Sequence, residues 1–193
     1  MFAWRQPLAT LLVPFGILTL FVCVPRAAAE SPESRSGAAQ LADQLRALHP
    51  SVRPDDAGRV ALHAYAAAAD LRRTYGPVGP PQFHNFLVNT GLKKRGLCHH
   101  WARDLGNRLA ALKLRTLLLR WGIARAGTLR EHNCVVVTAR GQPFEHGIVL
   151  DAWRHSGRLY ATRVAADNYP WKEDPADSFV ATGEHAVRVS KSD

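Results

Sequence analysis

Three residues of this chain, Cys98, His132 and Asp151, have side chains that together make an activated thiol nucleophile. In such a site a thiolate attacks a carbonyl carbon, an imidazole carries the proton, and a carboxylate orients the imidazole. Cys98 precedes a helical pattern, His132 opens an apolar run, and Asp151 ends another apolar run. Because each residue stands at the start or end of a predicted element, a catalytic site is favoured over an accidental occurrence of the three residue types.

Cys98 is expected at the first position of a helix. The pattern from Cys98 to about Leu112 places apolar residues three or four apart. A helix N-terminus carries partial positive charge and unsatisfied N–H groups, which stabilise a thiolate and can hold a developing oxyanion. Gly96 lets the backbone turn tightly into this helix. The position is therefore suited to a reactive cysteine.

A predicted hairpin brings the histidine and the carboxylate together. If residues 140–143 form the turn, Ala139 pairs with Phe144 and His132 faces Asp151 directly. Opposed residues of one face have Cβ atoms about 4.5–5.5 Å apart, which allows a hydrogen bond. Cys134 would share the face of His132, and Asn133 would point the other way.

The remaining elements predict an α+β fold, in which N-terminal helices and the Cys98 helix pack on an antiparallel sheet. Apolar spacing predicts helices over 38–49 and from Asp55 or Asp56, as cap, to Tyr75, with a helical turn at 83–88. Strands are predicted at 116–121, 134–138, 147–153 and 159–164, followed by a loop-rich tail from Asp167.

The N-terminal segment has the pattern of a secretory signal peptide, residues 1–29. A flexible leader is expected at 30–37 and a single domain at 38–193, located in the periplasm or outside the cell. An uncleaved anchor, or a lipoprotein modified at Cys23, remains an alternative. After removal of the signal peptide no membrane span is expected.

The formal net charge is +9, yet the arginines are spread along the chain and the longest basic run is Lys93–Arg95. No zinc-finger spacing, RNA-binding motif or helix-turn-helix pattern is present in the sequence. We therefore expect no nucleic-acid partner and attribute the charge to solubility.

The stretch 96–102, Gly-Leu-Cys-His-His-Trp-Ala, is similar to the Gly-x-Cys-x-x-aromatic-Ala helix start of the transglutaminase-like superfamily. With the order Cys, His, Asp, the region 95–153 resembles the bacterial transglutaminase-like cysteine proteinases. The resemblance implies a papain-like core, with Cys98 as nucleophile, His132 as general base and Asp151 as its partner.

The same resemblance implies acyl transfer at a peptide or protein amide of the cell envelope, ending in hydrolysis or transamidation. Papain-like sites often add an upstream amide to the oxyanion site, for which Asn85 and Asn89 are candidates ahead of Gln82. His99 and His100 stand where some members carry acidic calcium ligands. We therefore expect no calcium, no other metal and no cofactor.

Two alternatives remain open at this level. Cys98 and Cys134 are the cysteines left after signal removal, so they can form a structural disulfide in a non-catalytic secreted binding domain, or a reversible bond that blocks the nucleophile. Alternatively, Cys98, His99 or His100, His132 and Cys134 supply enough ligands for zinc, although their spacing matches no zinc motif.

Overall fold

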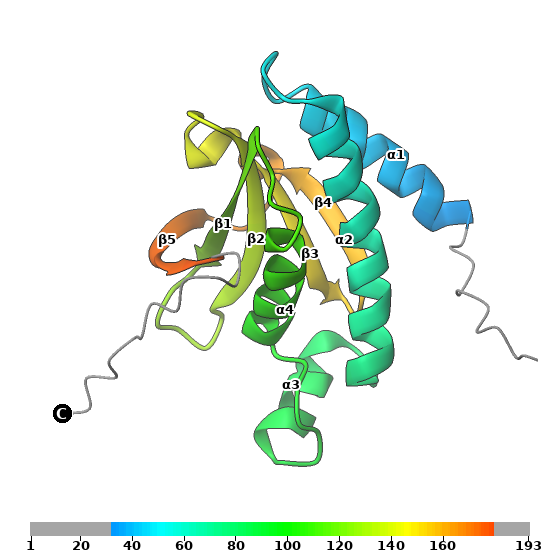
Figure 1. Ribbon diagram of the computed structural model, residues 1–193. Helices are drawn as coiled ribbons and strands as arrows, with labels where there is room; N and C mark the ends of the chain where they lie inside the picture. Colours follow the sequence, from blue (N-terminus) through cyan, green and yellow to red (C-terminus); the bar gives the residue numbers. More distant parts are fainter. Residues whose placement is uncertain (1–31, 180–193) are drawn as a thin grey trace, which may run out of the picture.

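The computed structural model describes residues 32–179, so the predicted signal peptide lies outside the described residues. Four helices and a five-stranded antiparallel sheet confirm the α+β class (Figure 1). The strand order is β4-β3-β2-β1-β5. The elements are α1 (Pro32–Arg46), α2 (Pro54–Tyr75), α3 (Pro81–Asn89), α4 (Cys98–Ala110), β1 (Leu117–Ala124), β2 (His132–Ala139), η1 (Phe144–His146), β3 (Ile148–His155), β4 (Arg158–Arg163), η2 (Val164–Ala166) and β5 (Trp171–Ser178).

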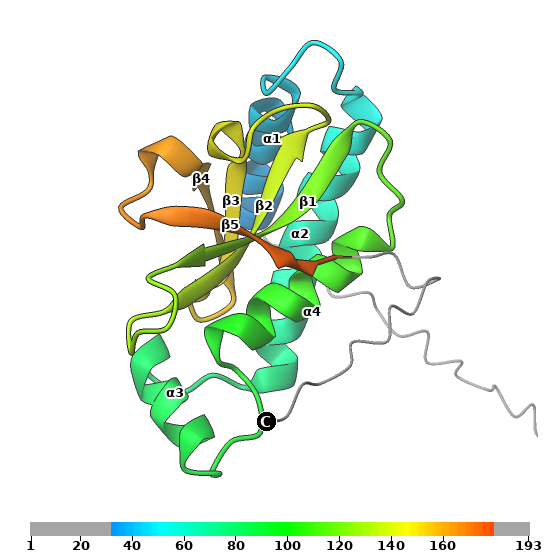
Figure 2. The same ribbon diagram turned by 90° about the vertical axis from the view of Figure 1, so that its left-hand side faces the viewer.

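The sheet has an apolar cluster on each face. Helices α2 and α4 pack on one face, and α1 packs on α2 (Figures 1 and 2). On β2, Val135 and Val137 belong to the helix-side cluster, whereas Cys134 and Val136 belong to the cluster under η1 and η2. Because side chains alternate along a strand and both faces are covered, every residue of β2 is buried.

The beginnings of two helices differ from expectation. Residues 32–37, predicted as part of a flexible leader, form the first turns of α1, because Pro32 and Glu33 are residue types that favour the start of a helix. Pro54 likewise starts α2, and no side chain caps that helix. The carboxylate of Asp56 turns instead toward the loop before β1. Within residues 32–179, no helix is both long enough and apolar enough to cross a bilayer.

The strand β5 was not predicted, because the tail from Asp167 was expected to be loop. Its sequence carries Lys, Glu, Asp and Pro, which are typical of an edge strand and uncommon in a buried one. It pairs only with β1, whose observed end at Ala124 lies beyond the predicted strand. Short-range hydrophobic alternation therefore gave no signal for it.

The register of the β2–β3 hairpin differs from the predicted one by two residues. Val135 pairs with Leu150, and Val137 with Ile148, so His132 is not directly opposite Asp151. The cause is η1 at Phe144–His146, because the predicted register counted regular pairing from Phe144 onward. An even shift leaves every side chain on its predicted face, so His132 and Asp151 still share a side of the sheet.

Asp56 connects α2 to the start of β1. Its side chain is buried, and one oxygen accepts hydrogen bonds from the backbone N–H groups of Arg115 and Thr116, at 2.9 and 2.8 Å, and from the Thr116 hydroxyl at 2.7 Å. Three donors converging on one buried carboxylate hold the loop in place. Removal of that carboxylate would leave them without this acceptor.

We therefore expect Asp56→Ala to lower the free energy of unfolding by about 3 kcal/mol, the cost of leaving buried donors unsatisfied. Urea denaturation followed by circular dichroism measures the change. The matched control is Asp55→Ala, which removes only a loose, exposed contact with Arg59 and should cost less than about 1 kcal/mol. Equal losses in the two variants would contradict the assigned role of Asp56.

Candidate active site

The turn into α4 positions Cys98 and depends on Gly96. The φ angle of Gly96 is 130°, a region that side chains rarely adopt, and a Cβ atom there would lie 2.2 Å from Nε2 of His84. The Gly96 carbonyl accepts a hydrogen bond of 2.9 Å from Trp101 Nε1, one turn into the helix. The glycine therefore allows His84 and the helix start to pack against each other.

The same helix start is supported from α2. The ring of Tyr75 packs edge-on against Trp101, with centroids 4.7 Å apart, and its hydroxyl donates to Asp104. Arg95 donates to both oxygens of Asp104 at 2.9 Å. These contacts fix the first turn of α4, so the position of the Cys98 side chain follows from packing on both sides.

The half-buried sulfur of Cys98 faces the beginning of β2. Asn133 Nδ2 lies 3.7 Å from Cys98 Sγ, and the carbonyl oxygen of Glu131 lies 3.8 Å from it. Asn133 is itself oriented by Trp121, whose Nε1 donates to its Oδ1 at 2.8 Å. Sequence reasoning did not select Asn133, although the alternation of β2 already placed it on the face opposite His132, which is where α4 packs.

His132 and Asp151 form a buried pair. His132 Nε2 lies 2.7 Å from Asp151 Oδ2, and both side chains are almost completely buried. A carboxylate accepts, so Nε2 carries the proton and Nδ1 is the nitrogen left for exchange. Nδ1 is buried and has no hydrogen-bond partner in the described residues. The geometry thus presents a basic nitrogen with its tautomer already fixed by Asp151.

Four donors hold the Asp151 carboxylate. Oδ1 accepts from the backbone N–H groups of Trp153, at 2.9 Å, and Arg154, at 3.0 Å. Oδ2 accepts from His132 and from Arg154 Nε at 3.0 Å. Burial acts to raise the pKa of Asp151, but the hydrogen bonds and charges of His132 and Arg154 hold it below the usual value. The carboxylate therefore stays ionised beside the imidazole.

Arg154 extends the network to the segment before β5. Its two terminal nitrogens donate to the two oxygens of Asp167 at 3.0 and 2.8 Å, a bidentate arrangement. Asp167 also accepts from Trp171 Nε1 at 3.0 Å. Asp167 was not selected from the sequence, because it lies in a stretch expected to be loop.

Aromatic rings enclose His132. The ring centroids of Trp153, Tyr169 and Trp171 lie 4.6, 4.9 and 5.3 Å from that of the imidazole. Two of these rings come from the segment leading into β5, so the unpredicted strand forms part of the wall around the histidine. The rings limit the access of water to the His132–Asp151 pair and thereby strengthen its electrostatics.

The pKa of Cys98 is lowered and the pKa of His132 is raised, so each group favours its charged form. Burial acts to raise the pKa of the Cys98 thiol, but the proximity and charge of His132, together with His99 and Asn133, lower it to about 6. Burial acts to lower the pKa of His132, but Asp151 and the Cys98 thiolate raise it to about 9. Between these two values the favoured state is a thiolate beside an imidazolium.

The amide candidates for an oxyanion site take different positions. Asn85 lies half-buried on α3, and its Oδ1 accepts a hydrogen bond of 3.0 Å from Trp153 Nε1. Trp153 in turn packs against the ring of His132, so a single side chain separates Asn85 from the imidazole. Asn89 and Gln82 are exposed. Asn85 is thus the amide of the three that the structure connects to the site. The N–H groups of the first turn of α4 are a second source of donors.

Cys134 and Cys98 are both free thiols and contact different apolar clusters, one on each face of the sheet. Burial raises the pKa of Cys134 well above its usual value, so this thiol is a poor nucleophile. Within residues 32–179, no group of three or more His, Cys, Asp or Glu side chains is arranged to hold a metal ion. The neighbours that lower the pKa of Cys98 are His132, His99 and Asn133.

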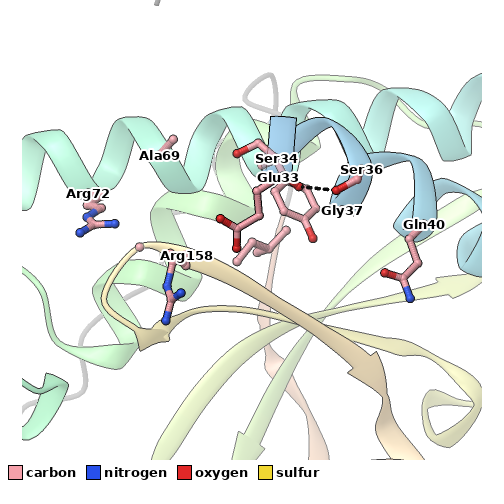
Figure 3. Close-up of a pocket in the computed structure, with 11 residues that line it drawn as sticks. Glu33, Ser34, Ser36, Gly37, Gln40, Ala69, Arg72 and Arg158 are labelled. Carbon is pink, nitrogen blue, oxygen red and sulfur yellow. Dashed lines mark hydrogen bonds between the residues drawn. The ribbon is translucent and has the colours of Figure 1, made fainter. Parts of the chain in front are cut away.

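A cleft of about 500 Å³ lies beside Cys98, and three residues around the thiol, His99, Glu131 and Asn133, line it together with Trp121 and Arg103. A different cavity, of about 470 Å³, lies between α1, α2 and the turn before β4 (Figure 3). Neither the cleft nor this second cavity is lined by Cys98, His132 or Asp151 themselves. Of the two, the cleft is the one lined by residues whose atoms lie next to the thiol, Glu131 and Asn133. The cleft is therefore the better candidate for binding a substrate.

The pKa values generate a prediction for alkylation of Cys98 by iodoacetamide. We expect the rate to reach half of its neutral-pH value near pH 6, because the thiolate forms as the pH rises through that value. In His132→Ala the midpoint should rise above about 8.5, the ordinary thiol value, because burial then acts with little opposition. Site-resolved mass spectrometry measures both. An unchanged midpoint in His132→Ala would rule out the pairing of thiol and imidazole.

Asp167→Asn tests the outer part of the network. The substitution leaves Arg154 without its bidentate partner, so we expect the free energy of unfolding to fall by about 3 kcal/mol. The pKa of His132 should also fall, because Arg154 then offsets more of the charge of Asp151. The upper limb of the pH–rate profile for Cys98 alkylation reports this pKa of His132. Asp43→Asn, which breaks an exposed pair with Arg46, should change the stability by less than about 1 kcal/mol and leave the profile unchanged.

Comparison of the chain with protein-family models, with curated proteins and with solved structures finds no match. The function therefore has to be inferred from the geometry of Cys98, His132 and Asp151.

Proposed function

We propose that this protein is a thiol acyl-transfer enzyme, a cysteine peptidase or amidase of transglutaminase-like type. One observation carries the proposal. A half-buried thiol at the start of a helix has its pKa lowered by a histidine whose other ring nitrogen lies 2.7 Å from a buried carboxylate. Buried ionisable groups are costly, and their concentration beside a cleft is more typical of catalysis than of stability.

In this proposal the Cys98 thiolate attacks the carbonyl carbon of an amide and forms a carbon–sulfur bond. Negative charge develops on the carbonyl oxygen, which the N–H groups at the start of α4 stabilise, aided by Asn133 or Asn85. The carbon–nitrogen bond then breaks, and the leaving amine takes the proton of the His132 imidazolium. His132 next removes a proton from water, or from an amine, which attacks the thioester and releases Cys98.

Asp151 contributes through His132. Its negative charge stabilises the imidazolium, and its hydrogen bond to Nε2 keeps Nδ1 available for the transferred proton. Arg154 fixes the carboxylate in turn. This division of roles supports a Cys-His-Asp mechanism in which the carboxylate is never itself protonated.

The order of elements supports the finer fold assignment, also as a proposal. A helix beginning at the nucleophile, packed on an antiparallel sheet whose successive strands carry the base and the carboxylate, is the arrangement that a papain-like core implies. The substrate would be a peptide or protein amide of the cell envelope, reached after export of the chain. No metal or cofactor enters the proposed mechanism.

An acylation experiment tests the proposed function. Incubation with p-nitrophenyl acetate should acetylate Cys98 and release p-nitrophenolate in a burst equal to the enzyme concentration. Intact and peptide mass spectrometry locate the acetyl group. Cys98→Ser should lower the burst rate at least a hundredfold, because a serine hydroxyl is not ionised by His132 at neutral pH.

Cys134→Ala is the matched control, because it removes the other described thiol from the opposite face of the sheet and should leave the burst intact. A burst that survives in Cys98→Ser, or that is lost only in Cys134→Ala, would contradict the proposed site. Circular dichroism of each variant confirms that the fold is retained.

A further inference from the structure

The end of the molecule formed by α3 and its loops exposes an unusual number of apolar side chains. Six large apolar side chains are exposed among the described residues, and four of them, Val78, Phe83, Phe86 and Leu92, fall within a short stretch of the sequence around α3. Phe86 is 56% exposed and Phe83 47%. A fifth, Leu129, lies in the loop between β1 and β2, which reaches the same end of the molecule as α3 (Figures 1 and 2).

The exposure of the two phenylalanines follows from how α3 is attached. His84 is the buried residue of this helix: its Nδ1 accepts from the Val78 N–H at 3.2 Å, and its Nε2 donates to the Arg95 carbonyl at 3.0 Å. These bonds fix which side of α3 faces the protein. Phe83 and Phe86 therefore project together on the outside, with ring centroids 6.3 Å apart.

The same end carries positive charge. Residues 76–95 include Lys93, Lys94 and Arg95 and contain no acidic residue; of the three cations, Arg95 is paired with Asp104. The β1–β2 loop adds Arg125 and Arg130, with Glu131 as its single acid. Exposed aromatic and aliphatic side chains among lysines and arginines match the two layers of a bilayer surface, apolar acyl chains beneath anionic headgroups.

We propose that this end of the protein, defined by Val78, Phe83, Phe86, Leu92 and Leu129 with the basic residues around them, binds the surface of an anionic phospholipid bilayer. The phenylalanines and leucines enter the boundary between headgroups and acyl chains, and the basic side chains contact the phosphates. Charge complementarity selects this partner, because a purely apolar protein interface would gain nothing from a predominantly basic border. The inference does not depend on the proposed acyl transfer.

Binding in this way would orient the rest of the molecule. The chain runs from Lys93 and Lys94 directly into the helix that begins at Cys98, so the thiol would be held near the bilayer. Peripheral binding of this kind needs no membrane-spanning helix.

Vesicle co-sedimentation tests the proposal, using vesicles of phosphatidylglycerol and phosphatidylcholine and vesicles of phosphatidylcholine alone. We expect the protein to bind the anionic vesicles, and both Phe86→Ser and Lys94→Glu to weaken that binding about tenfold. The matched controls are Leu62→Ser, which changes an apolar side chain on α2 that is 46% exposed, and Arg35→Glu, which changes an exposed cation on α1; neither should change binding. Equal binding to both vesicle types, or equal losses in tests and controls, would overturn the proposal.

A second measurement shows which part of the chain contacts the lipid, and so distinguishes binding through α3 from binding through another segment. In Phe86→Trp, brominated lipid should quench tryptophan fluorescence more strongly than in the unsubstituted protein, whereas Leu62→Trp should show no added quenching. Absence of added quenching at position 86 overturns the proposal, as does absence of vesicle binding, which would assign the patch to a protein partner instead. Circular dichroism shows that each variant is folded.

Discussion

The hydrogen bond between His132 and Asp151 is the interaction on which the candidate site depends. Both side chains are buried, and an ionised carboxylate in such a place is tolerated only when donors surround it. Here the donors are the imidazole, a guanidinium and two backbone N–H groups. Arg154 also needs a partner of opposite charge, because it is itself partly buried, and Asp167 supplies one. The edge strand β5 and the segment before it thus belong to the support of one carboxylate.

His132 connects the two faces of the sheet because of its position at the first residue of β2. The observed pairing of β2 with β3 covers Val135 to Val137 and does not extend to His132. Its ring is therefore held by side chains, with Nε2 on Asp151 and Trp153, Tyr169 and Trp171 around it. Cys98 meets the same strand end from the helix side, next to Asn133. A histidine in the middle of β2 would be restricted to one face.

Much of this arrangement could be predicted from the sequence, and the rest fails for identifiable reasons. Helix periodicity placed the start of α4 at Cys98, and alternation placed His132 and Asp151 on one face even though the register was wrong by two residues. The length of the hairpin connection depends on η1, which has no distinctive pattern. Arg154 and Asp167 are joined by a contact across 13 positions, and β5 has an edge-strand composition, so neither local propensity nor periodicity identifies them.

The register error amounts to two residues, and this even number explains why His132 and Asp151 still lie on the same side of the sheet. A shift of one residue would have moved Asp151 to the helix side of the sheet, away from His132, whereas a shift of two changes only the distance along the strand. The remaining offset is bridged at the irregular end of β3, where the pairing with β4 is interrupted between Asp151 and His155. There the backbone N–H groups of Trp153 and Arg154 turn toward the Asp151 carboxylate. The irregular strand end thus anchors one carboxylate oxygen on the backbone and leaves the other for the imidazole and the guanidinium, which regular pairing at these residues would not do.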